Sequence, residues 1–548
     1  MKKAKRFRLT KAAKVLIMIL IVALIGGGIF AGVQTGVIQT KKDKAGSSVA
    51  TSETVAKTEA TSDNEDMDKK NIVKQTETKK ENTKTDDTDT TINLSLDEWV
   101  GWKSIIDANG GLTTQSGSIY DKLGIKVNIN IINDATQSSN ALIKGDLNAA
   151  GYTINRTAFL SKKFTDAGKE VIMPYVTNYS NGGDGIIAKS SIQNVNDLVN
   201  AKIGVPEFSE AQTLVVWFVN NSDLSAKKKA KIIDNLVLFS TADDAAKAFF
   251  AGQIDVAATW EPYLTQAKNM TDAHVLFSTA SSSNLVMDGI LFDKKFAEAH
   301  ADVVEKFIQG SLEAADMYST EFDAIREVMP MFNTASDEDI VSNTESAKLT
   351  TWKDNSNLLN GTAKTIYTDM CNVWTSIGES VNPDLVDTIF DDTYINAIED
   401  KFSSTKVSNT KEVKVTKDNK QEIQDTEALL SGRASVTFIK NTAKFSDSAA
   451  ASEELNKFID IAKVLDGAII EIAGNTDPNP DSDPEDEYNK KLSQQRAEAV
   501  KNYFVMNGIS NGRIVVVGNG SSNPVVDNDT EEHRALNRRT DVSFKIIE

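Results

Sequence analysis

The chain has 548 residues, of which 40% are hydrophobic and 25% are charged, and its formal net charge is −18. This length exceeds what one hydrophobic core usually supports, so it predicts two or three domains. The acidic balance argues against a nucleic-acid partner, because phosphate binding needs clustered Lys and Arg. The single cysteine, Cys371, excludes an internal disulfide framework, a metal site of paired cysteines and lipidation near the N-terminus.

The N-terminal residues have the pattern of a membrane anchor. Residues 1–14 are rich in Lys and Arg and contain no acid, and an uncharged run follows from Val15 to Val33. A helix of this run spans about 28 Å, close to the roughly 30 Å hydrocarbon core. A cleaved signal peptide is the alternative, but its apolar region is shorter, and Ala31-Gly32-Val33 is a poor cleavage site. We therefore expect a single-pass cell-membrane protein whose N-terminus is cytoplasmic and whose bulk is extracytoplasmic.

Residues 34–91 are rich in Thr, Lys, Asp, Glu and Ser and have few large apolar side chains. Such a segment cannot bury enough apolar surface to offset its ordering entropy. It predicts a disordered stalk between the membrane and the first folded domain.

From residue 92 to residue 402 short apolar runs alternate with amphipathic stretches. INLSLDEW, IKVNINII, DGIIAK, AKIGVP and NLVLFS predict strands, and NALIKGDL and DDAAKAFFAG predict helices. Strands separated by helices imply a mainly parallel sheet. The length of this domain predicts two α/β lobes.

Several strings in this domain carry a family resemblance. They are Glu98-Trp99-Val100-Gly101-Trp102, ALIKGDLNAA at residues 141–150, GDGIIAK at residues 183–189, and AKAFFAGQIDVAATWEPY at residues 246–263. The domain resembles the substrate-binding proteins of ABC importers for nitrate, taurine and thiamine precursors. The resemblance implies a type II periplasmic-binding-protein fold in which two lobes close on a small solute, together with an ABC permease as partner.

By this resemblance we expect six side chains near the cleft: Trp99, Trp102, Asp134, Ser209, Trp260 and Glu261. Arg156 is a further candidate from its charge, with an ordinary exposed Arg as the alternative. Aromatic rings supply stacking area, and Arg156 is the cation that an anionic solute would need. Structural roles remain open for each of them. Trp260 suits a packing position at a strand end, Glu261 suits a helix cap, and Asp134 and Ser209 suit turns.

Residues 403–431 are again polar and predict a second tether, and residues 432–548 predict a compact α/β sandwich. In chain order we expect a strand in SVTFI, a helix in SEELNKFIDIAKVLD, a strand in AIIEIAG, a helix in LSQQRAEAVKNYFVMNG, and strands in RIVVVGNG and DVSFKII.

This domain resembles the OmpA-like peptidoglycan-binding domain through Gly474-Asn475-Thr476-Asp477, NKKLSQQRA at residues 489–497, Gly518-Asn519-Gly520 and RALNRR at residues 534–539. The resemblance implies that Asp477 and Arg496 hold the diaminopimelate of the stem peptide. Their chemistry suits a carbon that bears both an ammonium and a carboxylate. Asn489 and Arg538 are expected to shape that site, and the loop PNPDSDPEDEY is longer and more acidic than is usual for the family.

The sequence indicates a binding protein. It contains no GxSxG, HExxH or P-loop motif, its three histidines are far apart, and it implies no metal or cofactor. The leading prediction is a membrane-anchored solute-binding protein that also binds peptidoglycan without a covalent bond. The alternative is a structural linker between membrane and cell wall whose middle domain no longer serves transport. An ion-driven motor stator is excluded, because that class requires an acid within the membrane span.

Overall fold

A computed structural model of the chain describes residues 90–282, 284–317, 320–402, 413–439, 441–478 and 487–547. All of them lie in the second of the two units into which the chain divides, Asp87–Glu548. The expected basic tail, membrane helix and nearly all of the expected stalk lie outside the described residues. Within the described ranges no helix is both long and apolar enough to cross a bilayer.

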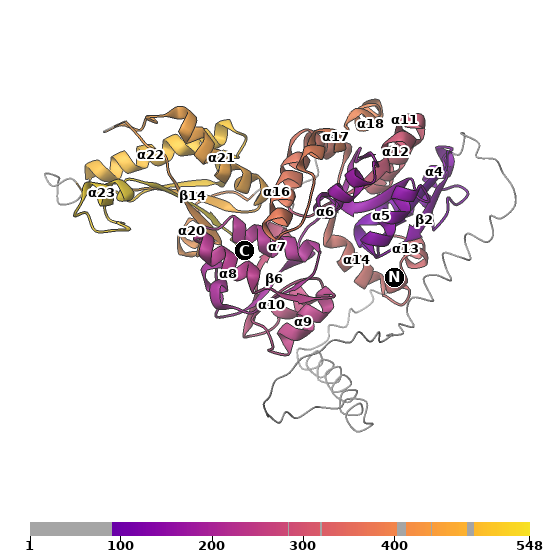
Figure 1. The fold of residues 1–548 in the computed structure, drawn as a ribbon, viewed down its shortest axis with the longest axis horizontal. Coiled ribbons are helices and arrows are strands. Elements are labelled where there is room, and N and C mark those ends of the chain that lie inside the picture. The colour runs from indigo at the N-terminus through magenta and orange to yellow at the C-terminus, as the bar shows by residue number, and fades with distance from the viewer. Residues whose placement is uncertain are drawn as a thin grey trace, which may run out of the picture. The chain divides into compact units, whose positions relative to one another are not determined.

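The first lobe of the middle domain is built on one mixed sheet (Figure 1). Its strands are β1 (Ile92–Leu96), β2 (Val127–Ile131), β3 (Ala149–Thr153), β4 (Val171–Ile172), β5 (Val176–Ser180), β11 (Met287–Asp293) and β12 (Ala347–Leu349). The strand order is β12-β5-β11-β3-β1-β2, and β4 pairs with β11. β1 pairs in parallel with β2 and β3, whereas β11 and β12 pair antiparallel with their neighbours.

Helices connect these strands and pack around the sheet. They are α3 (Lys103–Asn109), α4 (Ile119–Lys122), α5 (Ala135–Lys144), α6 (Ile154–Asp166), α11 (Lys294–Ala299), α12 (Ala301–Met317), α13 (Asp323–Val328), α14 (Asp337–Glu345), α15 (Trp352–Asn357), α16 (Ala363–Ser376), α17 (Val386–Ile389), α18 (Thr393–Asn396) and α19 (Glu399–Phe402). Local sequence fixes their ends. The Asp134 carboxylate begins α5 by accepting the N–H groups of Thr136 and Gln137, and Gly145 ends it at a φ of 84°.

The second lobe lies between β5 and β11 in the sequence, so the chain passes between the lobes twice. Its strands are β6 (Asp184–Lys189), β7 (Ile203–Pro206), β8 (Val237–Phe239), β9 (Val256–Trp260) and β10 (Ala273–Ser278), in the order β10-β6-β9-β7-β8. Its helices are α7 (Glu210–Asn220), α8 (Ala226–Asp234), α9 (Ala242–Phe250) and α10 (Tyr263–Lys268). This sheet is also mixed, because β6 pairs antiparallel with β9 and β10.

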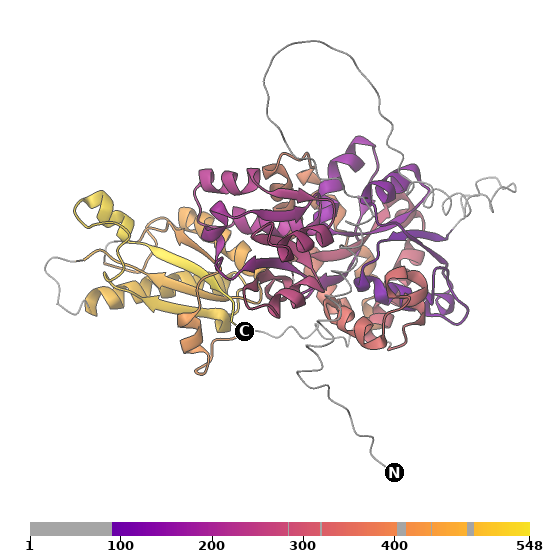
Figure 2. The same ribbon diagram turned by 90° about the horizontal axis from the view of Figure 1, so that it is seen from below.

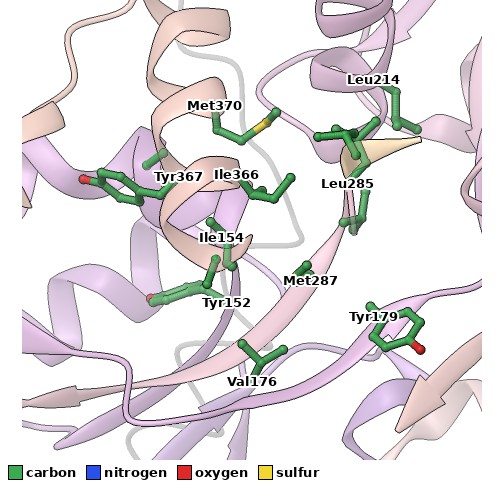
Figure 3. Close-up of a cluster of buried hydrophobic side chains, with 14 of the residues drawn as sticks. Tyr152, Ile154, Val176, Tyr179, Leu214, Leu285, Met287, Ile366, Tyr367 and Met370 are labelled. Carbon is green, nitrogen blue, oxygen red and sulfur yellow. The ribbon is translucent and has the colours of Figure 1, made fainter. Parts of the chain in front are cut away.

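The lobes share an apolar core where α7 packs against α6 and α16. Figure 3 shows Leu214 of α7 in this core together with Leu285, Met370, Ile366 and Tyr152. All five side chains are buried. Cys371 on α16 is 2% exposed and belongs to the same core. Burial on this scale stabilises one arrangement of the two lobes.

The C-terminal domain is a sheet with its two long helices on one face; Figure 2 shows the strands from the other face. Its elements are α20 (Lys420–Asp425), β13 (Leu430–Ala434), α21 (Ser448–Val464), β14 (Ile469–Gly474), α22 (Glu487–Met506), β15 (Ile514–Gly518), α23 (Glu531–Asn537) and β16 (Thr540–Lys545). The strand order is β13-β16-β14-β15, and β14 and β15 run parallel.

The structure corrects two expectations about the strands. The sheets of the middle domain are mixed rather than mainly parallel, because β11 returns from the second lobe in the opposite direction. The first strand of the C-terminal domain is β13, ahead of the expected SVTFI, and SVTFI itself forms only an isolated bridge between Phe438 and Phe445. β13 pairs with β16 along its whole length. This pairing makes the segment a strand although its apolar pattern is weak.

Candidate functional site

Four carboxylates gather where the two lobes meet. Asp97 follows β1 and Asp288 lies near the start of β11, both in the first lobe. Asp184 is the first residue of β6 and Glu210 is the first residue of α7, both in the second lobe. The charge of Asp288 interacts with those of Asp97, Glu210 and Asp184. The junction is therefore strongly acidic.

Trp99 contributes an aromatic ring to this junction. Its indole Nε1 donates to Asp288 Oδ2 over 3.0 Å and to Asn178 Oδ1 over 3.1 Å. Its ring lies over Gly183, where an added Cβ would come within 3.2 Å of the ring. Because Gly183 precedes the first strand of the second lobe, Trp99 contacts both lobes.

Arg156 forms an ion pair across the lobe junction. Its Nε and Nη2 donate to the two oxygens of Glu210 over 3.1 and 2.9 Å. Thr153 Oγ1 also donates to Glu210, over 2.9 Å. The side chains of Arg156 and Glu210 are 20% and 14% exposed. The guanidinium of Arg156 is therefore occupied by a partner within the protein, which speaks against the expected role as the counter-ion of an anionic solute.

Burial changes the acidity of these carboxyl groups. It raises the pKa of Asp184 to about 6, against the opposing effect of a hydrogen bond from Ser180. Burial also raises the pKa of Asp97, and Trp102 Nε1 donates to that side chain over 2.7 Å. For Asp288, burial and then the charges of Asp97 and Glu210 hold the pKa well above its usual range.

The other expected residues divide between packing, capping and exposed positions. Trp102 is 1% exposed, and its ring fills the space beside Gly151 in the first lobe. Asp134 begins α5 and Ser209 begins α7, so each has a capping role. Glu261 accepts hydrogen bonds from the N–H and the hydroxyl of Thr265. Trp260 is 38% exposed and lies opposite Asp184 in the β6–β9 ladder.

The sequence analysis did not identify Asp184 and Asp288 as site residues. Both stand in an Asp-Gly pair that opens an apolar run, in DGIIAK and in DGILF. A charged residue at the start of a buried strand was the signal available in the sequence. In the described parts of the chain no group of His, Cys, Asp and Glu is placed to hold a metal ion. A surface hollow of about 780 Å³ lies elsewhere, beside Phe159 and Lys163.

In the C-terminal domain two glycines let α22 lie close to the sheet. An added Cβ on Gly474 would come within 2.1 Å of the Ser493 carbonyl oxygen, and one on Gly518 within 2.7 Å of the Lys490 carbonyl oxygen. Ser493 also accepts a hydrogen bond from the Gly520 N–H over 2.9 Å. These approaches place the first two turns of α22 beside the ends of β14 and β15.

Asp477 and Arg496 lie near each other without forming an ion pair. Asp477 instead accepts a hydrogen bond from Arg538 Nη1 over 2.9 Å. Asp477 is close enough to act on the charge of Arg496, whose pKa is lowered first by burial. The Asp477 side chain is 25% exposed, so one face of the carboxylate is open to solvent.

Arg496 contacts two residues of the segment that precedes α21. Its Nε donates to the Thr442 carbonyl oxygen over 3.2 Å, and its guanidinium lies 5.1 Å from the centre of the Phe438 ring. Its two terminal nitrogens have no hydrogen bond to any described residue. A buried guanidinium that is positioned but not neutralised is suited to receive a carboxylate.

The remaining motif residues have structural roles. Asn475 accepts from the Asn519 side chain and donates to Asp541, which also pairs with Arg539. Asn537 accepts from the Val525 N–H and donates to the Val526 carbonyl oxygen. Asn489 is 4% exposed. Most of the acidic loop between Asp477 and Asn489 lies outside the described residues.

Comparison with known proteins identifies two regions. Residues 110–321 match the family described as NMT1/THI5 like. Residues 437–538 match the OmpA family.

Curated relatives match short stretches of the chain. Outer membrane porin F of Pseudomonas fluorescens is 50% identical over 77 residues, which cover 14% of this chain and 22% of that protein. Outer membrane protein A of Bordetella avium is 42% identical over 83 residues, 15% of this chain and 41% of the relative. Peptidoglycan-binding protein ArfA of Mycobacterium tuberculosis is 41% identical over 90 residues, 16% of this chain and 26% of the relative. The chain thus spans less than half the length of each of these relatives.

Similar solved structures cover the middle domain. The periplasmic aliphatic sulphonate binding protein SsuA from Escherichia coli is 14% identical, with a TM-score of 0.42, and the match covers 56% of this chain and 99% of that one. The periplasmic nitrate-binding protein NrtA from Synechocystis is 10% identical, with a TM-score of 0.42, and the match covers 57% and 89%. The chain thus has a middle domain that matches the NMT1/THI5-like family and a C-terminal domain that matches the OmpA family.

Proposed function

We propose that the chain is an extracytoplasmic binding protein that holds peptidoglycan with its C-terminal domain and a small solute with its middle domain. The observation that carries the proposal is a pair of opposite charges, Asp477 in the turn after β14 and Arg496 on α22. Asp477 is partly exposed, and Arg496 is positioned by Thr442 and Phe438, with no hydrogen bond from its terminal nitrogens to any residue of the described ranges. The 41% identity to peptidoglycan-binding protein ArfA over this region supports the same function.

The chemistry of the stem peptide fits this pair. The free end of diaminopimelate carries an ammonium and a carboxylate on one carbon. The Asp477 carboxylate would accept the ammonium, and the Arg496 guanidinium would donate two parallel hydrogen bonds to the carboxylate. Neither contact forms or breaks a covalent bond, so we propose binding rather than catalysis.

Co-sedimentation of the full chain with diaminopimelate-containing sacculi tests this site. The Asp477→Ala and Arg496→Ala variants should each remain in the supernatant under conditions in which the parent sediments. The matched control is Arg513→Lys, a conservative change at a buried Arg of the same domain that donates to the main-chain carbonyls of Ala462, Leu465 and Ala468. Sedimentation of both alanine variants at the parental level would refute the assignment.

The solute site is proposed at the lobe junction of the middle domain. Two lobes joined by two chain passages, with an aromatic ring and several buried carboxylates between them, are the parts from which a cleft-type binding site is made. The match of residues 110–321 to the NMT1/THI5-like family supports this role. Mass spectrometry of small molecules released from the purified chain by denaturation tests it directly. Release of nothing, together with no thermal stabilisation by any metabolite pool, would favour the alternative of a structural linker.

We further propose that residues 15–33 anchor the chain in the cell membrane and that an ABC permease takes the solute from the middle domain. The first proposal rests on the uncharged run behind a basic tail. Fractionation of cells that produce the chain tests the anchor, since the chain should stay with the membranes after washing in high salt and leave them only with detergent.

A further inference from the structure

We propose that the solute of the middle domain is a small organic cation, such as an amine or amidine, bound between Asp97, Asp184 and Asp288. The inference rests on the proposed solute-binding function of the lobe junction. It specifies the chemical class of the solute that binds at that junction.

The balance of charge at the junction favours a cation. Arg156 is the basic residue whose charge acts on Asp97, no basic residue is among the main influences on Asp184 or Asp288, and Glu210 already accepts hydrogen bonds from Nε and Nη2 of Arg156. Three buried or half-buried carboxyl groups therefore remain without a counter-ion. An anion placed there would meet like charges in a poorly solvated setting, which is unfavourable.

A second observation concerns hydrogen bonds rather than charge. Asp288 is 2% exposed and Asp184 is 7% exposed, yet in the described residues each has a donor on only one of its two oxygens, from Trp99 and from Ser180 respectively. The buried Ser95 hydroxyl, two residues before Asp97 in the sequence, has no hydrogen-bond partner among the described residues. The second oxygens of Asp184 and Asp288 are not sealed from solvent, so a ligand ammonium or amidinium can reach them and donate several N–H groups.

Two indole rings complete the environment. Trp99 donates to Asp288, and the exposed Trp260 lies directly opposite Asp184 in the β6–β9 ladder. Tryptophan faces attract organic cations more strongly than other aromatic side chains do. A bare metal ion is a poorer fit, because no group of acids and His in the described ranges is close enough to coordinate one.

Thermal shift and calorimetric titration of the detergent-purified full chain test the charge of the ligand. The cationic probes are choline, putrescine and benzamidine, and the anionic probes are methanesulfonate, taurine and nitrate. The test variants are Asp184→Asn and Asp288→Asn, which keep side-chain shape and remove charge. Asp146→Asn, in the exposed loop after α5, is the matched control.

We expect at least one cationic probe to raise the melting temperature, and each test variant to weaken its binding at least tenfold while Asp146→Asn binds like the parent. Variants that do not melt cooperatively without probe are replaced by Asp97→Asn. Stabilisation by anions alone would overturn the inference while solute binding stands. No binding by any probe, with an anion among the co-purified molecules, would also overturn it. No binding and no co-purified molecule would overturn the solute-binding function as well.

Discussion

Arg538 holds Asp477 against the first turn of α23: its Nη1 donates to Asp477 over 2.9 Å and its Nη2 donates to Glu531 over 2.6 Å. The guanidinium thus connects the turn after β14 to the helix before β16. This link positions the Asp477 carboxylate beside Arg496 without neutralising Arg496.

The first prediction follows from this link. Arg538→Ala should weaken sacculus binding several-fold, and less than Asp477→Ala does, because the carboxylate is kept but no longer held in place. Arg538→Lys should restore part of the loss, since one ammonium cannot hold both acids in the same geometry. Arg534→Ala is the control, because Arg534 pairs with Glu531 but not with Asp477. Equal weakening by Arg534→Ala and Arg538→Ala would show that only the stability of α23 matters.

The second prediction separates the two tryptophans that follow β1. Trp102→Ala should lower the free energy of unfolding by about 3–5 kcal/mol, because it empties a fully buried position. Trp99→Phe removes the indole N–H that Asp288 accepts and should weaken solute binding with a small effect on unfolding. Chemical denaturation and ligand titration of both variants measure these effects. A Trp102→Ala chain that is stable but does not bind would contradict the packing role.

The third prediction concerns the Arg156–Glu210 pair. A double-mutant cycle with Arg156→Ala and Glu210→Ala should give a coupling free energy of about 1–3 kcal/mol, since the pair has two hydrogen bonds and limited exposure. The same exposures argue against a surface-pair value near zero. A coupling below about 0.3 kcal/mol would mean that solvent or lobe motion separates the two side chains.

The fourth prediction is a pH dependence that arises from Asp184. Its pKa is raised to about 6 in the folded chain, so the folded state binds this proton more tightly than the unfolded state does. The group therefore favours folding at low pH, and that contribution is lost as the pH rises through 6. Ligand-free Asp184→Asn should be more stable than the parent at pH 7.5, by on the order of 2 kcal/mol, and the difference should shrink towards pH 4.

Urea denaturation of the parent and of Asp184→Asn at several pH values measures this difference. Glu210 is the charged group that adds to the effect of burial on Asp184, so Glu210→Gln should reduce the difference slightly. A difference that does not change between pH 4 and pH 7.5 would contradict the raised pKa.

The sequence predicted the elements with strong apolar patterns. INLSLDEW, DGIIAK and AIIEIAG lie on β1, β6 and β14, because alternating or continuous apolar residues are buried in these strands. It failed at β13, whose residues LSGRA have no such pattern and are fixed by pairing with β16. The position of β11 between β5 and β3 could not be predicted from local sequence patterns. It depends on where the chain returns from the second lobe.

The candidate sites show the same limit. The resemblance to the OmpA-like domain implied that Asp477 and Arg496 act together, and in the structure Asp477 is close enough to act on the charge of Arg496. The sequence did not show that Arg538 is the partner of Asp477, or that Arg156 pairs with Glu210, because those contacts join elements distant in the chain. Asp184 and Asp288 come together only through the packing of two lobes. The hydrogen bond from Trp99 to Asp288 and the nearby charge of Asp184 are visible only in the structure.

Competition with a free amino acid tests the proposed grip on the cell wall most directly. The parent chain is sedimented with sacculi in the presence of increasing meso-diaminopimelate or, as the matched control, increasing lysine capped on its α-amino and α-carboxyl groups. That compound presents a side-chain ammonium without the neighbouring carboxylate. We predict that diaminopimelate releases the chain from the sacculi and that capped lysine does not, because Arg496 requires the carboxylate. Equal release by both compounds, or release by neither, would contradict the account.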